Sequence, residues 1–296
     1  MAYSIHILAR IRIIYPLTLL FFIACNTLTG QPSVDLKEVI YQAEDRGTVE
    51  EVLSLITADN EASTASLIVT VGNHFLGTPY VAHTLESDRE QLIINLREVD
   101  CTTFAEYCLA LAATAKSTRN TFGHFAAELQ KIRYHDGVID GYPSRLHYFC
   151  DWIYTNEQKG LIKDMSKDLA LTPLNKSIDF MSTHPDSYKQ LKEDPALVEK
   201  IARQEKEISK REMYYIPESR VAGLENQLME GDIVGITTGV KGLAITHVGI
   251  LVKRDGRIHL LHASSAAEKV VVSEVTLEAY LANSKSANGI MVARPL

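Results

Sequence analysis

The sequence predicts an α+β fold in which helices come first and antiparallel strands follow. Three observations support this class: apolar residues with a 3.6-residue period near the start, a polar middle punctuated by prolines, and strand-like segments at the end. With 296 residues, 46% of them hydrophobic and 23% charged, the chain can bury a substantial core. The net charge of -7, without a long basic run, argues against a nucleic-acid partner.

The first segment has the features of an export signal. A basic start leads into an apolar stretch at residues 13–24, which is too short for a typical transmembrane helix. A small residue precedes Cys25, as in bacterial lipoproteins, so we expect a lipid anchor there; ordinary cleavage near Gly30 is the alternative. We therefore expect residues 1–30 to be a signal and residues 31–296 to be one exported, periplasmic domain.

The elements before the middle region can be placed from periodicity and turn residues. Residues 35–57 read as a helix, and a second helical run at 62–76 stops at Gly77. Residues 91–96 resemble a short strand, and a further helix is expected over 101–115.

The middle, roughly residues 117–225, is expected to be a helical elaboration packed on the core and shaping a pocket. Its clearest element is a charged helix at 195–213, whose charges are typical of a solvated face. Beyond it, alternating patterns predict strands at 232–237, 246–252, 257–263, 270–273 and 289–293.

Cys101 is the first candidate for chemistry. Asp100 is a suitable N-cap for the apolar helix that follows, and a thiolate at a helix N-terminus is stabilised by exposed N–H groups and the helix dipole. We therefore expect a lowered thiol pKa at Cys101 and a nucleophile there. Cys108 lies two turns further on and reads as a core residue. Cys108 and Cys150 either form a disulfide, which an exported protein permits, or stay free and buried.

Two histidines downstream are brought together by a predicted hairpin. Residues 255–256 are Asp-Gly, a strong signal for a two-residue turn. That turn pairs Arg254 with Arg257, and the same register places Gly249 opposite His262. A three-residue loop would reverse the faces.

With this register, His247 and Gly249 share a face of the sheet with His262. The two histidines become diagonal neighbours, with backbones roughly 7–8 Å apart, within reach of two imidazoles. His259 pairs with Val252 and points to the other face. Simple cross-strand packing of the histidines is the alternative.

Together these residues suggest a cysteine hydrolase. Cys101 would attack an amide carbonyl, and His247 would take the thiol proton and return it to the leaving amine. His262 would orient His247 and stabilise its cation. Backbone N–H groups at the helix start, with Tyr80, would hold the oxyanion.

Several motifs resemble the NlpC-type, papain-like cell-wall hydrolases: Gly77-Thr-Pro-Tyr80, Asp100-Cys-Thr, His247-Val-Gly-Ile and His262-Ala-Ser. A longer resemblance, over about residues 70–296, is to the N-acetylmuramoyl-L-alanine amidases of NlpC type. Its marks include Asn95-Leu-Arg-Glu-Val-Asp-Cys-Thr-Thr-Phe104, Ser144-Arg-Leu-His-Tyr148 and Tyr215-Ile-Pro217. Ala244 departs from that pattern, where Asp is expected.

The resemblance implies a papain-like core, with a nucleophile helix packed on an antiparallel sheet, and hydrolysis of the lactyl–L-alanine amide in peptidoglycan fragments. It implies no metal or cofactor. We also expect a monomer that meets a membrane only through a lipid on Cys25. Arg145 is a candidate to grip a stem-peptide carboxylate bidentately. The candidate substrate contacts are Tyr80, Asp100, Thr103, Arg145, His147, Tyr148, Trp152 and Ser264, with helix packing as the alternative for the aromatic cluster.

Three other functions stay open at this point. One is cleavage of the γ-D-glutamyl–diaminopimelate bond by the same fold. Another is a zinc amidase with His247, His262 and a carboxylate or Cys as ligands, although their spacing matches no compact zinc motif. The third is a lipoprotein that binds muropeptides without cleaving them.

Overall fold

The structure is a computed structural model that describes residues 34–57 and 61–296. The expected export signal, with Cys25 and Gly30, lies outside these residues, so its cleavage and lipidation stay predictions. The described residues belong to one compact unit. None of the helices within them is long and apolar enough to cross a membrane.

The chain begins with η1 (Leu36–Glu38), α1 (Ala43–Ile56) and α2 (Thr64–His74). The single helix expected over 35–57 is interrupted, because Ile40 leaves the helical path and forms an isolated bridge with Ile93. A capping box with Asp45 then starts α1. The chain turns after α2 at Gly77, whose φ of 87° lies in the region that favours glycine.

The strand predicted at residues 91–96 is wrong: apart from one bridge, this segment is an irregular loop. Side chains of α1 and of the helix that follows accept hydrogen bonds from backbone N–H groups of this loop, in place of a neighbouring strand. The Leu96 N–H donates to Asp45 at 2.9 Å, and the Asn95 N–H donates to the Tyr107 hydroxyl at 3.0 Å. The loop is therefore fixed where it enters the next helix.

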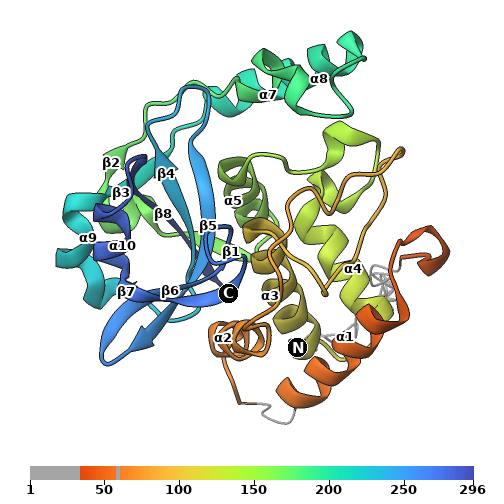
Figure 1. Ribbon diagram of the computed structural model, residues 1–296, viewed down its shortest axis with the longest axis horizontal. Coiled ribbons are helices and arrows are strands. Elements are labelled where there is room, and N and C mark those ends of the chain that lie inside the picture. The colour runs from red at the N-terminus through yellow and green to blue at the C-terminus, as the bar shows by residue number, and fades with distance from the viewer. Residues whose placement is uncertain (1–33, 58–60) are drawn as a thin grey trace, which may run out of the picture. The chain divides into compact units, whose positions relative to one another are not determined.

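That helix is α3 (Cys101–Lys116), which packs against α4 (Phe122–Arg133), and α4 in turn contacts α5 (Phe149–Gln158) (Figure 1). A buried ion pair joins α3 to α4, with Arg133 Nε 2.7 Å from Glu106 Oε2. Arg133 also donates to the Ile93 carbonyl at 2.7 Å. Losing one partner of such a pair would leave a buried charge, so the contact holds α3 in one orientation.

The middle of the chain, residues 117–225, is part of the core and of the sheet, whereas we expected an elaboration packed on the outside of the core. It supplies α4 and α5 to the core and three short strands to the sheet. The charged helix expected over 195–213 ends earlier, and a strand follows it. The remaining elements are η2 (His135–Gly137), η3 (Tyr142–Ser144), β1 (Ile162–Asp164), α6 (Ser166–Ala170), β2 (Thr172–Pro173), α7 (Phe180–Thr183), η4 (Pro185–Ser187), α8 (Pro195–Ser209), β3 (Tyr214–Pro217), α9 (Glu218–Leu224) and η5 (Glu225–Gln227).

The five strands predicted for the last part of the chain are confirmed. They are β4 (Ile233–Thr238), β5 (Ile245–Arg254), β6 (Arg257–Ser264), β7 (Lys269–Thr276) and β8 (Ala287–Pro295), with α10 (Leu277–Ala282) between the last two. In the described residues the sheet order is β2-β3-β8-β4-β5-β6-β7, with β1 also on β8, and every pair is antiparallel. The α+β class is therefore confirmed.

The sheet has an apolar core on each face. Val248 and Ile250 of β5 belong to the core shared with α1 to α5, while Leu251 belongs to a second core. That second core includes residues of α9 and α10, which cover the opposite face of the sheet in Figure 1. Alternation along β5 thus assigns each side chain to one face.

The predicted hairpin is confirmed. Asp255 and Gly256 have φ of 52° and 77°, as a type I′ turn requires. Arg254 pairs with Arg257, as expected. The register between β5 and β6, on which the histidine assignment depends, therefore has the predicted value.

Candidate active site

The N-terminus of α3 is built by its own side chains. Asp100 accepts hydrogen bonds from the Thr102 N–H at 3.0 Å and the Thr103 N–H at 2.8 Å. The Thr103 hydroxyl in turn accepts from the Asp100 N–H at 2.9 Å, which completes a capping box. Thr103 is 1% exposed, so the prediction that it contacts substrate is wrong. Its function is to fix the helix start.

Cys101 opens α3 and lies beside β5. Pairing between β5 and β6 stops at Ile250 and Leu261, so the strands separate beyond that point. Val248, past the last pair, lines the same cavity as Cys101. The nucleophile candidate thus lies beside β5 where its pairing with β6 has ended.

Burial and the neighbouring Asp100 carboxylate raise the pKa of the Cys101 thiol to about 12, while hydrogen bonds from Val248 and Thr102 oppose the shift. The lowered thiol pKa expected from the helix N-terminus is therefore wrong for the resting site. Desolvation of the charged form outweighs the hydrogen bonds that favour it. The resting thiol is protonated.

The two predicted histidines are in direct contact. His247 Nε2 lies 2.6 Å from His262 Nδ1, and the ring planes meet at 82°. Burial lowers the pKa of His247 to about 4; burial and His247 lower the pKa of His262 to about 3. The predicted shared face is confirmed, and the pair is neutral at neutral pH.

Gly249 also has its predicted place. A Cβ on this residue would lie 3.2 Å from His262 Cβ, which puts Gly249 against His262 on the same face. His259 pairs with Val252, and its Nδ1–H donates to the Ser273 carbonyl at 2.9 Å. His259 is thus kept out of the site, as predicted.

Two tyrosines lie near the thiol. Burial raises the pKa of both Tyr80 and Tyr280, and the charge of Cys101 adds to the shift in each case. Tyr80 was predicted from its motif. Tyr280 of α10 was not, because nothing in the sequence around it signals a site and only the packing of α10 on the sheet brings it to the histidines.

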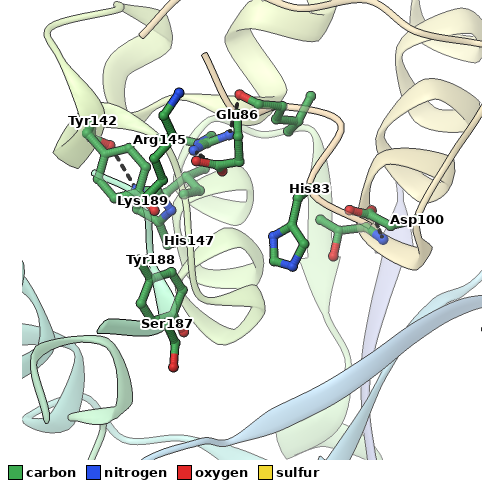
Figure 2. Close-up of a pocket in the computed structure, with 12 residues that line it drawn as sticks. His83, Glu86, Asp100, Tyr142, Arg145, His147, Ser187, Tyr188 and Lys189 are labelled. Carbon is green, nitrogen blue, oxygen red and sulfur yellow. Dashed lines mark hydrogen bonds and ion pairs between the residues drawn. The ribbon is translucent and has the colours of Figure 1, made fainter. Parts of the chain in front are cut away.

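Cys101 and His247 line a cavity of about 170 Å³. A larger cavity of about 430 Å³ adjoins it and shares four lining residues with it. The shared residues are Thr102, Leu146, His147 and Tyr188. In Figure 2, His83 and Asp100 lie on one side of this larger cavity, with Arg145 and Glu86 on another. The two cavities form a path that leads to the thiol.

Arg145 lines the larger cavity, but its guanidinium already has partners. It donates to Glu86 at 2.9 Å and to the Leu85 carbonyl at 3.2 Å, and its Nε lies 3.5 Å from Glu90 (Figure 2). The side chain is 6% exposed. The predicted bidentate grip on a substrate carboxylate is therefore wrong for this conformation, because the fork is occupied.

The neighbours of Arg145 differ in their access to the cavities. His147 lines both, while its Nε2–H donates to the Tyr142 carbonyl at 2.8 Å. Tyr148 lines the smaller cavity, but its hydroxyl donates to Glu205 of α8 at 2.5 Å. The Met181 N–H donates to that same hydroxyl at 2.8 Å. The ring of Tyr148 therefore lines the cavity, while its hydroxyl connects α7 and α8 through hydrogen bonds.

Two other predicted contacts are corrected by burial. Trp152 is fully buried and stacks on Phe149 at 4.7 Å between ring centroids, so helix packing, the alternative, applies. Ser264 is the buried last residue of β6, and its hydroxyl accepts from the Ala267 N–H of the following turn at 3.1 Å. Neither lines the two cavities.

Cys108 and Cys150 are free thiols and both are buried, so no disulfide joins them. Within residues 34–57 and 61–296, no cluster of three or more His, Cys, Asp or Glu side chains could hold a metal ion. The chemistry available at the site is that of a thiol beside a coupled pair of neutral imidazoles.

The family model and several solved structures point to one family. The family model described as AmiA-like, N-acetylmuramoyl-L-alanine amidase-like, matches residues 70–290. A crystal structure of an N-acetylmuramoyl-L-alanine amidase from Bacteroides uniformis ATCC 8492 is 42% identical, with a TM-score of 0.76, covering 79% of this chain and 99% of that one.

Two further structures resemble the chain. One from Bacteroides fragilis, described as a candidate xylanase, is 44% identical with a TM-score of 0.71, covering 76% of this chain and 99% of that one. Protein LPG0564 from Legionella pneumophila, at 22% identity and a TM-score of 0.64, covers 86% of this chain and 95% of its own and shares the fold. The comparison with curated proteins finds no match.

Proposed function

Because the chain belongs to the AmiA-like family of N-acetylmuramoyl-L-alanine amidase-like proteins, we propose that it cleaves the amide between the lactyl group of muramic acid and L-alanine, with Cys101 as nucleophile. The observation that carries the mechanism is the thiol at the start of α3 beside the His247–His262 pair. A nucleophile helix packed on an antiparallel sheet also supports a papain-like, NlpC-type core.

The first half of the reaction forms a thioester. Since His247 Nε2 is engaged by His262, Nδ1 is the nitrogen left to take the Cys101 proton. The sulfur then attacks the lactyl carbonyl carbon. Negative charge develops on the carbonyl oxygen, where N–H groups at the start of α3, together with Tyr80, would stabilise it.

His247 next gives the proton to the L-alanine nitrogen, and the C–N bond breaks to release the peptide amine. In the second half a water attacks the thioester carbonyl while His247 accepts its proton. When the thioester C–S bond breaks, His247 returns its proton to the Cys101 sulfur, which yields the muramic carboxylic acid and restores the thiol. His262 stabilises the His247 cation in both halves.

The structure does not favour the glycosidase suggested by the name of the Bacteroides fragilis relative. Most glycosidases place two carboxyl groups about 5–9.5 Å apart across the scissile bond. The cavity at Cys101 is lined by no Asp or Glu among the described residues. In the adjoining cavity Glu86 is paired with Arg145, and Asp100 caps α3.

An amidase that acts on cell-wall fragments is consistent with the export expected from the N-terminal segment. We extend the proposal to an exported, periplasmic protein that is monomeric and is anchored, if at all, by a lipid on Cys25. Export is tested by fractionating the bacterium, and a lipid on Cys25 by mass spectrometry of the mature N-terminus.

Mass spectrometry of products from defined muropeptides tests the function. The proposal expects a peptide with a free L-alanine amino terminus and a sugar acid, and it is refuted if the products instead show cleavage between D-glutamate and diaminopimelate. Cys101→Ala should be inactive, whereas Cys108→Ala should stay active as the matched thiol control. Long incubation with iodoacetamide should abolish turnover and a chelator should leave it unchanged; the reverse would exclude the cysteine mechanism.

A further inference from the structure

The ring of Tyr280 lies against both histidines of the candidate site. It lies on α10, whose start is capped by the Thr276 hydroxyl accepting from the Ala279 N–H at 3.3 Å. Its ring centroid is 5.4 Å from that of His262 with planes at 85°, and 6.5 Å from that of His247 with planes at 22°. The three rings therefore form one cluster on the face of the sheet that α10 covers.

The pair of imidazoles poses a question of proton placement. Both rings are neutral at neutral pH, so each carries one N–H, and one nitrogen of the 2.6 Å contact must donate to the other. If His247 Nε2–H donates, His247 Nδ1 is free to accept the Cys101 proton. If His262 Nδ1–H donates instead, the His247 proton lies on Nδ1 and the base is blocked. The tautomer of His262 therefore decides whether His247 can act.

In the productive arrangement His262 carries its proton on Nε2. In the described part of the chain, no protein group forms a hydrogen bond with that nitrogen, and it is not among the fully buried atoms that lack a partner. What lies against the ring is Tyr280, with perpendicular planes at a centroid distance typical of an edge-to-face pair. The negative face of an aromatic ring accepts N–H donors weakly, so Tyr280 is the neighbouring group within the protein that could accept this proton.

We propose that Tyr280 is a positioning residue whose ring face accepts the His262 Nε2–H and so holds His262 in the tautomer that leaves His247 Nδ1 free. The role belongs to the ring more than to the hydroxyl, for which no hydrogen bond to either histidine is formed in the described residues. Burial and the nearby Cys101 raise the pKa of Tyr280, so the phenol also stays neutral. This inference rests on the proposed cysteine mechanism.

The tautomer is measured on the wild-type protein by nitrogen-15 NMR of its histidine side chains. We expect His262 to be protonated at Nε2 and unprotonated at Nδ1. A proton on His262 Nδ1 would overturn the proposal, whichever bond the enzyme cleaves. If no muropeptide is hydrolysed, the proposed function fails while this measurement still decides the role of Tyr280.

Turnover of the same muropeptides tests the consequence. Tyr280→Phe keeps the ring and should keep kcat within about twofold, whereas Tyr280→Leu should lower kcat roughly tenfold to a hundredfold and leave KM within about threefold. The control Tyr154→Leu makes the same change at a surface tyrosine, 43% exposed, and should leave kcat unchanged. A Tyr280→Leu enzyme with wild-type kcat, or one with only KM altered, would refute the proposal. If that variant does not fold, the wild-type tautomer decides.

Discussion

Gly249→Ala is the change that tests most directly how the sheet positions the histidine pair. The added Cβ would lie 2.6 Å from Leu260 Cδ1, 2.8 Å from Leu260 Cγ and 3.2 Å from His262 Cβ. Real Cβ contacts at the first two distances essentially do not occur, so Leu260 or the strand must move. Because His262 lies on the same face, its ring is displaced relative to His247.

The expected size of the effect follows from these contacts. Overpacking a close-packed core costs about 1–3 kcal/mol of unfolding free energy, which for a domain of this size lowers Tm by about 2–12 °C. Weakening the 2.6 Å bond between the two histidines reduces the stabilisation of the transition state, in which His247 is a cation, by up to about 1.5–3 kcal/mol. That corresponds to a fall in kcat of roughly tenfold to a hundredfold.

Differential scanning calorimetry and muropeptide turnover, measured well below the Tm of the variant, separate the two effects. Gly47→Ala is the matched control, because no atom of residues 34–57 and 61–296 lies within 4 Å of a Cβ there and Gly47 is exposed within α1. It should leave kcat unchanged and Tm equal or higher. If Gly249→Ala keeps both the Tm and the kcat of the wild type, the close packing of Gly249 against Leu260 and His262 does not position the pair.

Four further predictions concern charge. Since His247 must be neutral to accept a proton and burial lowers its pKa to about 4, the acid limb of the kcat/KM profile should lie near pH 4, not near the ordinary value of about 6.5. The unfolded chain then binds this proton before the folded one, so unfolding free energy should fall as pH drops from about 6.5 toward 4 in urea titrations. Glu205→Ala removes a buried acceptor and should cost about 1–3 kcal/mol of stability with a raised KM, while Glu199→Ala, exposed on the same helix, should do neither. Arg145→Ala leaves Glu86 unpaired and should lower stability by about 3–5 kcal/mol; a raised KM at unchanged Tm would instead restore Arg145 as a substrate contact.

Local rules predicted the C-terminal half of the molecule well. Asp255 and Gly256 set a turn whose type fixes the register of both strands, and side-chain alternation then assigns the faces of His247, His262 and His259. None of these steps needs a contact from elsewhere in the chain. The N-cap of α3 was predictable for the same reason, since capping involves only neighbouring residues.

Predictions failed where long-range packing overrides local pattern. The apolar segment at 91–96 has the composition of a strand, but Asp45 and Tyr107 bind backbone N–H groups at its end, and among the described residues only an isolated bridge lies beside it. Arg145 and Trp152 are residue types that often bind ligands. Here the Arg145 guanidinium is bound by Glu86, and Trp152 is completely buried and cannot reach a ligand. Neither fact is visible in the sequence.

The thiol pKa shows most clearly what a local rule omits. A helix N-terminus favours a thiolate, yet burial and Asp100 outweigh that effect at Cys101, just as burial keeps His247 neutral. A preformed ion pair would need both shifts reversed, so proton transfer from sulfur to imidazole has to accompany attack on the carbonyl. Oxidation and alkylation of cysteine also proceed through the thiolate, so a thiol that is protonated at rest reacts slowly with both oxidants and alkylating agents. The burial that makes Cys101 a poor nucleophile in the free protein is thus compatible with catalysis, provided that His247 keeps Nδ1 open to receive the proton when substrate arrives.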